Sequence, residues 1–219
     1  DLTVGENLRF FADLYLVSKH DRLERQKRLM KFSRLGPFTN RRASKLSGGM
    51  KQKLALMCAL IHTPKLLILD EPTTGVDPVS RQEFWTILRE LAGQGIGILV
   101  STPYMDEASL CDNILMMYEG LIIGAGKPGE ITTLFPDRLL EIRSNDLTEI
   151  KRTLQEKYPT LSVQRFGDKL HIPYSDNEQF EVIKSAVPDN TQINQIQPGI
   201  EDTFVALMSK QKVPFESSS

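Results

Sequence analysis

Residues 46–49, Leu-Ser-Gly-Gly, and residues 66–72, Leu-Leu-Ile-Leu-Asp-Glu-Pro, decide the fold class of this chain of 219 residues. The first stretch is a Ser-Gly-Gly turn that leads into a helix-forming run. We expect this helix to span residues 50–60 with Ser47 as its N-cap. Because the two glycines carry no side chains, the first backbone N–H groups of the helix stay uncovered and suit an anion such as a phosphate.

The second stretch predicts a strand that ends in two carboxylates. Residues 66–69 are all apolar, which is typical of a strand buried on both faces of a parallel sheet, and Asp70 and Glu71 follow at once. In open α/β sheets, ligands bind beyond the carboxyl ends of the strands, where these two side chains would lie. Phosphate-facing backbone groups together with paired carboxylates predict a site for a nucleotide and Mg²⁺.

These residues also carry a resemblance to a known family. Residues 46–49 resemble the signature motif of ATP-binding-cassette (ABC) ATPases, and residues 66–71 resemble their Walker B strand with its following glutamate. Residues 75–77, Gly-Val-Asp, resemble their D-loop. The three motifs fit the family in order and spacing. The resemblance implies an α/β fold, a partial P-loop NTPase (RecA-like) cassette with a helical subdomain.

The resemblance further implies what the residues would do. In the family, ATP lies between two cassettes, so that the P-loop of one and the signature motif of the other contact the same nucleotide. Asp70 would hold Mg²⁺ through water, and Glu71 would orient or deprotonate the attacking water. The residues that would bind ATP across the interface are Leu46, Ser47, Gly48, Gly49, Gln52 and Asp77.

Two of these assignments compete with purely structural roles. Residues 47–49 also form an ordinary capped helix start, and Asp77 is a good N-cap before Pro78. We favour phosphate binding for the turn, because it accompanies the strand that ends in two carboxylates. For Asp77 we weigh capping and a role across the cassette interface equally.

One family motif is missing from the 219 residues. A P-loop needs Gly, four residues, then Gly-Lys-Ser/Thr, and the nearest match, Gly126-Lys127, has Leu121 at the first position and Pro128 at the last. The chain begins at Asp1 in a segment that resembles the region after the family's Q-loop. We therefore expect a fragment without its P-loop portion, inactive alone, although a natural protein without a P-loop is the alternative.

A second departure is Pro103, which stands where the family normally has a histidine that contacts the γ-phosphate. Proline offers neither an imidazole nor an N–H group. The residues around it also predict a helix start, with Thr102 as N-cap and Pro103 at the first helical position. Hydrolysis at this site would be slow or would use another group. The alternative is a degenerate, non-catalytic cassette that serves as a dimerisation or regulatory module, which Pro103 favours and Glu71 opposes.

Composition and charge limit the function classes. The chain is 40% hydrophobic and 25% charged, as is ordinary for a globular protein, and no uncharged apolar run reaches the roughly 18 residues of a membrane span.

Residues 18–45 hold ten Lys or Arg and two acidic residues, a net charge of +8. Because the whole chain has a net charge of −1, the remaining residues carry −9. A basic surface can attract nucleic acid or anionic lipid. Without interleaved aromatic residues, we favour a solvated helical face over nucleic-acid binding.

Helical periodicity and turn signals divide the N-terminal part of the chain. We expect a helical subdomain over about residues 1–60, which opens with a capping box at residues 3–6, and a RecA-like part over about residues 61–135. The further elements expected here are a helix from Ser18 that ends at Gly36-Pro37, a helix from Pro78 with Val79, Phe84, Ile87, Leu88 and Leu91 inside, a turn over 120–128, and strands at 96–100, 114–118 and 121–123.

Residues 136–212 predict a small α+β accessory domain of ferredoxin-like β-α-β-β-α-β order. This part resembles the C-terminal region of ABC-2-type exporter ATPases. We expect His171 to be a packed or solvent-facing strand residue rather than a ligand, and residues 213–219 to form a disordered tail. The elements expected here are strands at 139–143, 161–166, 169–173 and 192–196 and helices at 146–157, 179–187 and 200–210.

The resemblance as a whole implies part of the ATP-binding subunit of an ABC transporter. Such a subunit couples ATP binding and hydrolysis, with Mg²⁺, to transport by membrane partners. Its partners would be a second cassette and transmembrane permease subunits, which would hold it at the cytoplasmic face of the plasma membrane. We expect no nucleic-acid partner. These residues do not indicate which substrate is transported.

Overall fold

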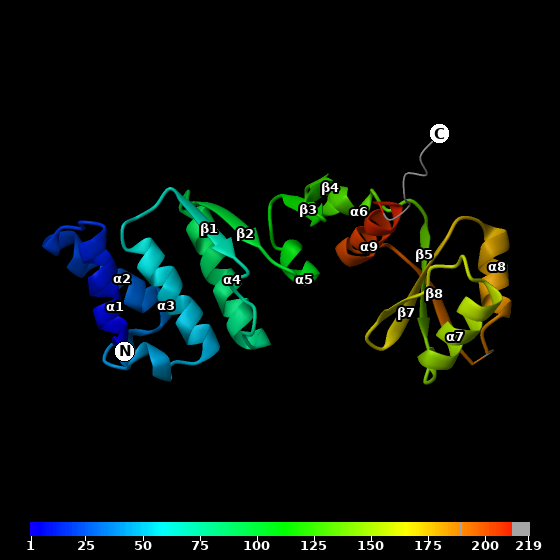
Figure 1. The fold of residues 1–219 in the computed structure, drawn as a ribbon, viewed down its shortest axis with the longest axis horizontal. Helices are drawn as coiled ribbons and strands as arrows, with labels where there is room; N and C mark the ends of the chain where they lie inside the picture. The colour runs from blue at the N-terminus through cyan, green and yellow to red at the C-terminus, as the bar shows by residue number, and fades with distance from the viewer. Residues whose placement is uncertain (189, 212–219) are drawn as a thin grey trace. The chain divides into compact units, whose positions relative to one another are not determined.

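A computed structural model describes residues 1–188 and 190–211, which form two compact units, Asp1–Tyr104 and residues 105 onward (Figure 1). The tail predicted over 213–219 lies outside the described residues. Within the described part, no helix is both long and apolar enough to span a membrane.

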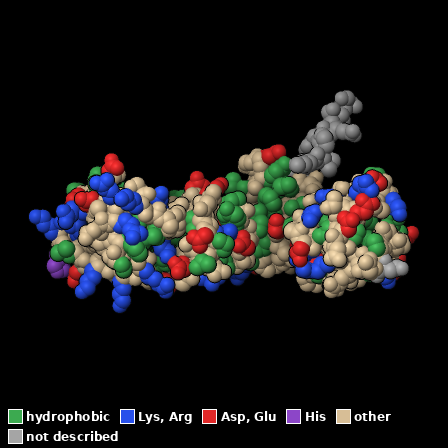
Figure 2. Space-filling model, turned by 90° about the horizontal axis from the view of Figure 1, so that it is seen from below, with side chains coloured by type: hydrophobic (Ala, Val, Ile, Leu, Met, Phe, Trp, Pro, Cys, Tyr) green, Lys and Arg blue, Asp and Glu red, His purple; other side chains and the backbone are tan. Residues whose placement is uncertain are grey.

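The first unit begins with a block of three helices, α1 (Val4–Leu14), α2 (Lys19–Ser33) and α3 (Gly48–Leu60). The predicted capping box is present at the start of α1. Helix α2 ends at Ser33, before the predicted stop, because Arg34 adopts a left-handed conformation with φ 60°. Both α1 and α2 pack against α3. Lys and Arg side chains gather over this block in Figure 2.

The same unit contains a two-stranded parallel sheet of β1 (Leu66–Asp70) and β2 (Gly97–Ser101), joined by α4 (Pro78–Gly93). The predicted inner face of α4 is largely correct, since Phe84, Ile87, Leu88 and Leu91 are buried together with Trp85. Val79 was wrongly placed on that face and is 67% exposed. At about 100° per residue it lies on the opposite side of the helix.

Strand β1 differs from the prediction of burial on both faces. Leu67 is buried, whereas Leu66 and Ile68 are exposed, Ile68 to 70%. Successive side chains of a strand point to opposite faces, so only one face of this two-stranded sheet is covered within the described residues. On the neighbouring strand, Leu99 is exposed in the same way.

The second unit contains the antiparallel hairpin of β3 (Ile114–Tyr118) and β4 (Leu121–Gly126), with the short helices α5 (Met105–Ala108) and α6 (Pro128–Thr132) and the terminal helix α9 (Ile200–Gln211). Residues 120–128, predicted as a turn, instead form β4 and the start of α6. The turn itself is at Glu119-Gly120, where both residues have positive φ.

Helix α9 packs against β4, α5 and α6, and its Ile200 joins Ile114, Met116 and Ile131 in one apolar cluster. Residues 105–135 therefore share a compact unit with the end of the chain. The division into a cassette over 1–135 and an accessory domain over 136–212 stays a prediction.

The remaining elements form the predicted β-α-β-β-α-β unit. They are β5 (Arg138–Arg143), α7 (Leu147–Lys157), β6 (Gln164–Phe166), β7 (Lys169–Tyr174), α8 (Asn177–Ser185) and β8 (Gln192–Ile196). The sheet is antiparallel in the order β6-β7-β5-β8. Alternate residues of β5 and β7 on one face, such as Leu140 and Leu170, form a core with α7 and α8. The other face of these strands carries Glu141 and His171.

Candidate functional site

The signature-like turn folds as predicted into a capped helix start. Ser47 is the N-cap of α3, and its Oγ accepts a hydrogen bond from the backbone N–H of Met50 at 3.3 Å. Ser47 and Gly48 are exposed, so their backbone faces solvent. Leu46 is buried and Gln52 is half-buried. The nucleotide-binding roles assigned to these residues stay predictions.

Gly49 is buried, for a reason that the sequence does not reveal. A Cβ atom at this position would lie 2.5 Å from the Cβ of Ser80 and 2.6 Å from its Oγ. The start of α3 therefore lies directly against the start of α4. A Cβ on Gly48 would meet only the carbonyl oxygen of Gly75, at 3.4 Å, so that the signature turn lies beside the D-loop-like residues.

The two carboxylates lie at the end of β1, as predicted, and are held by the neighbouring strand. Asp70 is paired in register with Ser101 at the end of β2. The Ser101 hydroxyl donates to Asp70 Oδ1 at 2.5 Å, and the Glu71 backbone N–H donates to the carbonyl oxygen and to the hydroxyl of Ser101, both at 3.0 Å. Sequence reasoning missed Ser101, since it lies 31 residues from Asp70 and only the strand register joins them.

Glu71 has an unusual backbone conformation. Its φ is +43°, in the left-handed region that L-residues rarely adopt. Its carboxylate is exposed and accepts one hydrogen bond from Thr74, at 3.0 Å. Strain of this kind concentrates at functional sites, where surrounding contacts hold it in place. Here the two hydrogen bonds to Ser101 provide those contacts.

Asp77 performs the capping role that was one of its two predicted roles. It is the N-cap of α4, and its Oδ1 accepts from the backbone N–H of Ser80 at 2.9 Å. This hydrogen bond lowers the pKa of Asp77, so the side chain is held as a carboxylate. Its role across a cassette interface stays a prediction.

The predicted helix start at Pro103 is displaced by two residues. Helix α5 begins at Met105, and Thr102 Oγ1 accepts from the backbone N–H of Tyr104 at 3.1 Å. Pro103 is exposed just beyond the end of β2. The guanidinium of Arg81 lies 3.9 Å from the centre of the Tyr104 ring, as a cation–π contact.

The carboxylates at the end of β1 fit Mg²⁺ only as part of a site in which water and nucleotide phosphates supply the other ligands. Among residues 1–188 and 190–211, no group of three or more His, Cys, Asp or Glu side chains could hold a metal ion. Mg²⁺ commonly takes one or two carboxylates and completes its shell with water and substrate phosphates. The exposed Asp70 carboxylate could hold the ion through one of those waters.

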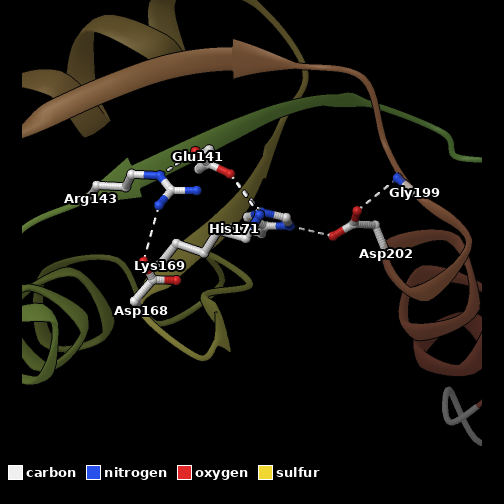
Figure 3. Close-up of polar contacts among 7 residues, drawn as sticks. All are labelled: Glu141, Arg143, Asp168, Lys169, His171, Gly199 and Asp202. Atoms are coloured by element: carbon white, nitrogen blue, oxygen red, sulfur yellow. Dashed lines mark hydrogen bonds and ion pairs between the residues drawn. The ribbon is translucent and has the colours of Figure 1, made fainter. Parts of the chain in front are cut away.

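A second group of charged residues lies in the other unit, and its carboxylates are paired with neighbouring side chains (Figure 3). We call it the β5–β7 charge cluster, and its members are Glu141, Arg143, Asp168, Lys169, His171 and Asp202. His171 and Asp202 are both about 92% buried by side chain, and His171 Nδ1 lies 2.6 Å from Asp202 Oδ1. Asp202 Oδ2 also accepts from the backbone N–H of Gly199 at 2.8 Å. His171 is thus a packed residue, one of the two outcomes expected.

Glu141 occupies the centre of the β5–β7 charge cluster. It accepts hydrogen bonds from Arg143 at 2.7 Å and Lys169 at 2.8 Å, which lower its pKa to about 2. His171 Nε2 lies 3.6 Å from the same carboxylate. The carboxylates of this cluster are paired within the fold, whereas those at the end of β1 are open to solvent.

Comparisons with known proteins identify relatives of this chain. A model of the family described as ABC transporter matches residues 1–74. The probable multidrug ABC transporter ATP-binding protein YbhF of Escherichia coli (strain K12) is 41% identical over 217 residues, which cover 95% of this chain and 36% of that protein. The Nod factor export ATP-binding protein I of Rhizobium leguminosarum bv. viciae is 34% identical over 213 residues, which cover 96% of this chain and 68% of that protein.

The chain belongs to the ABC transporter ATP-binding proteins. Solved structures of ABC cassettes are similar to this ABC protein over part of its length. The structure of cbiO1 from Clostridium perfringens, part of the ABC transporter complex cbiONQ, aligns with 72% of this chain and 58% of that chain, with 28% identity and a TM-score of 0.56. An ATP-binding subunit of an ABC transporter aligns with 62% of this chain and 57% of that chain, with 32% identity and a TM-score of 0.54.

Our ABC protein spans 36% of the length of YbhF and 68% of the rhizobial relative. It shares the mixed α/β fold of the cassettes over the aligned part. Its match with both relatives extends through nearly the whole chain, including the region of the β5–β7 charge cluster.

Proposed function

We propose that this chain is part of the ATP-binding subunit of an ABC exporter, which couples ATP binding and hydrolysis to transport by membrane permease subunits. The observation that carries this proposal is the edge formed by Asp70 and Glu71, which Ser101 holds at the end of β1. Glu71 keeps a strained backbone conformation and an exposed carboxylate, as expected of a group that must reach a substrate.

Each residue of the site has a distinct role in this proposal. Glu71 orients or deprotonates the water that attacks the γ-phosphate, and Asp70 holds Mg²⁺ through water. Bound Mg²⁺ would neutralise charge that develops on the phosphates. Ser47 and Gly48, exposed at the start of α3, donate to the γ-phosphate of ATP bound by the partner cassette. Asp77 contacts the partner, while Gly49 sets the packing of α3 on α4.

The partners in this proposal are a second cassette, identical or different, and permease subunits. The names of the two relatives speak of multidrug transport and Nod factor export, which supports export as the direction of transport. The permeases would hold the subunit at the cytoplasmic face of the plasma membrane. We expect no nucleic-acid partner in this function.

The experiment that tests the proposal compares Glu71→Gln with wild type in the full-length protein reconstituted with its permease. Loss of the carboxylate should lower ATP turnover by about 10²–10⁴-fold. The matched control is Glu119→Gln, because Glu119 is also an exposed glutamate with positive φ, +49°, and lies in the β3–β4 turn. Equal turnover in wild type and Glu71→Gln would overturn the catalytic assignment.

Pro103 favours a second candidate function, a degenerate cassette that supports dimerisation while its partner hydrolyses ATP. In the full-length protein, Pro103→His should raise turnover if the missing histidine limits catalysis. One donor to the developing charge contributes on the order of 3 kcal/mol at best, which is about a hundredfold in rate. Since α5 begins only at Met105, removal of the proline should disturb the fold little.

The measurement is ATP turnover, with ATP affinity and the circular dichroism spectrum as controls for binding and folding. Unchanged turnover in Pro103→His would favour either another group at this position or the degenerate cassette. Glu71→Gln then distinguishes these two, because only a catalytic cassette should lose turnover through that substitution.

A further inference from the structure

The positive charge of this chain is concentrated on the N-terminal helical block. Residues 18–45 carry ten Lys or Arg and two acidic residues in a chain whose total charge is −1. In Figure 2, Lys and Arg side chains crowd the part of the first unit that holds α1 and α2. A basic surface of this kind can attract anionic partners over roughly one Debye length.

Helix α2 uses its cations in two ways. Arg22 and Arg25 are half-buried, and they pair with Asp13 at 2.5 Å and with Asp21 at 3.7 Å. Arg25 also donates to the carbonyl oxygen of Ile61 at 3.1 Å. These arginines therefore fix α2 within the fold and have little capacity left for another partner.

The lysines of α2 are different. Lys19, Lys27 and Lys31 are exposed, and within the part of the chain that the structure describes none of them makes an ion pair. Their spacing places them with Leu23 along one side of the helix, since residues four apart are neighbours on a helix surface. An exposed row of unpaired ammonium groups is thus available to an external anion.

Two exposed leucines accompany these lysines in the sequence. Leu23 is 69% exposed between Lys19 and Lys27, and Leu16, in the turn before α2, is 90% exposed with φ +55°. Single exposed leucines are ordinary on a protein surface. Beside a row of lysines, such side chains can enter the apolar boundary of a membrane while the ammonium groups contact its headgroups.

We propose that the exposed side of α2, with Leu16, Lys19, Leu23, Lys27 and Lys31, binds the anionic phospholipid headgroups of a membrane surface. We choose lipid over nucleic acid because a phosphate backbone attracts lysines but gives the two leucines no apolar environment. The inference goes beyond the proposed function, since this contact requires neither nucleotide nor a permease.

One acidic residue opposes the contact. Glu24 is exposed on the same part of α2, whereas Asp21 is engaged by Arg25. Removal of the Glu24 charge should therefore strengthen binding to an anionic surface. Such a gain of affinity with an unchanged circular dichroism spectrum is informative, because a change of fold then does not explain it.

The experiment measures flotation of the chain with vesicles of phosphatidylcholine alone and of phosphatidylcholine mixed with phosphatidylglycerol. We expect binding only to the anionic vesicles, weaker at high salt. Lys27→Gln with Lys31→Gln should lower the partition coefficient about 30-fold, or about fivefold per lysine. The matched control is Lys157→Gln with Lys184→Gln, which removes the same charge from exposed positions on α7 and α8.

Two further variants separate the contributions. Leu23→Gln should weaken binding several-fold without a change in its salt dependence, and Glu24→Gln should strengthen it. Equal loss in the two double-lysine variants would overturn the proposal, because net charge alone would then explain binding. Tighter binding to duplex DNA than to anionic vesicles at the same salt would also overturn it. Glu71→Gln should bind vesicles like wild type, so that failure here and failure of the proposed activity remain distinguishable.

Discussion

Two regions of the molecule carry carboxylates on or beside the strands of a sheet, and the surroundings of these carboxylates differ. At the end of β1, Asp70 and Glu71 are exposed, and their partners are hydroxyl groups and backbone. In the β5–β7 charge cluster, Glu141 and Asp202 are buried and paired with cations or with an imidazole.

The difference follows from burial. A buried ionised group must be paired, because the loss of its hydration is costly, so pairing in the β5–β7 charge cluster serves the fold. Exposed carboxylates that the fold leaves open can still bind a metal ion or position water. Glu71 also has a φ of +43°, in the left-handed region that L-residues rarely adopt.

The largest effect on folding should follow from Asp202→Ala. This change leaves the buried His171 without its partner at 2.6 Å and removes the acceptor for the Gly199 N–H. Each donor that loses this acceptor costs about 1–3 kcal/mol of unfolding free energy. Urea unfolding measures it, with the exposed Asp168→Ala as control. A loss no greater than that of this exposed member of the cluster would contradict a structural role for the buried His171–Asp202 pair.

A smaller effect is expected where the two motifs of the first unit meet. Gly49→Ala would put a Cβ 2.5 Å from that of Ser80, and such overpacking costs about 1–3 kcal/mol. Gly48→Ala is the matched control, since its Cβ would meet only an ordinary contact at 3.4 Å. Unfolding free energies of both variants test this, and Ser80→Gly should rescue the first. Equal stability of the two alanine variants would mean that α3 and α4 do not meet there.

The third expected effect depends on pH. Arg143 and Lys169 lower the pKa of Glu141 from its usual 4.5 to about 2, so the folded state favours the ionised form. Its contribution to stability is therefore complete above about pH 4.5 and is lost as pH falls toward 2. The stability difference between wild type and Glu141→Gln should shrink across this window in urea titrations. A difference that stays constant from pH 6 to about pH 3 would argue against the paired carboxylate.

The motifs and the element order could be predicted from sequence, because their signals are local. Ser47 as N-cap, Asp77 as N-cap and the β-α-β-β-α-β order each depend on neighbouring residues or on short periodic runs. What the sequence did not reveal depends on contacts between distant residues. Asp70 with Ser101 and His171 with Asp202 are each 31 residues apart.

Burial was the other failure of sequence reasoning. The apolar run of β1 was expected to be covered on both faces, but only one face is covered among the described residues, and Ile68 is exposed. The hydrophobicity of a strand indicates that both of its faces can be buried. It does not indicate whether neighbouring elements are present to bury them. The exposed Val79 shows the same limit for a helix, since its neighbours determine which face is inside.

The most direct test of the contrast between the two regions measures turnover and unfolding free energy for Glu71→Gln and Glu141→Gln, side by side in the full-length protein with its permease. Glu71→Gln should lower turnover about 10²–10⁴-fold and change stability by less than about 0.5 kcal/mol. Glu141→Gln should cost about 1–3 kcal/mol of stability and leave turnover per folded molecule unchanged. Full turnover in Glu71→Gln, or lost turnover in a folded Glu141→Gln protein, would contradict the account.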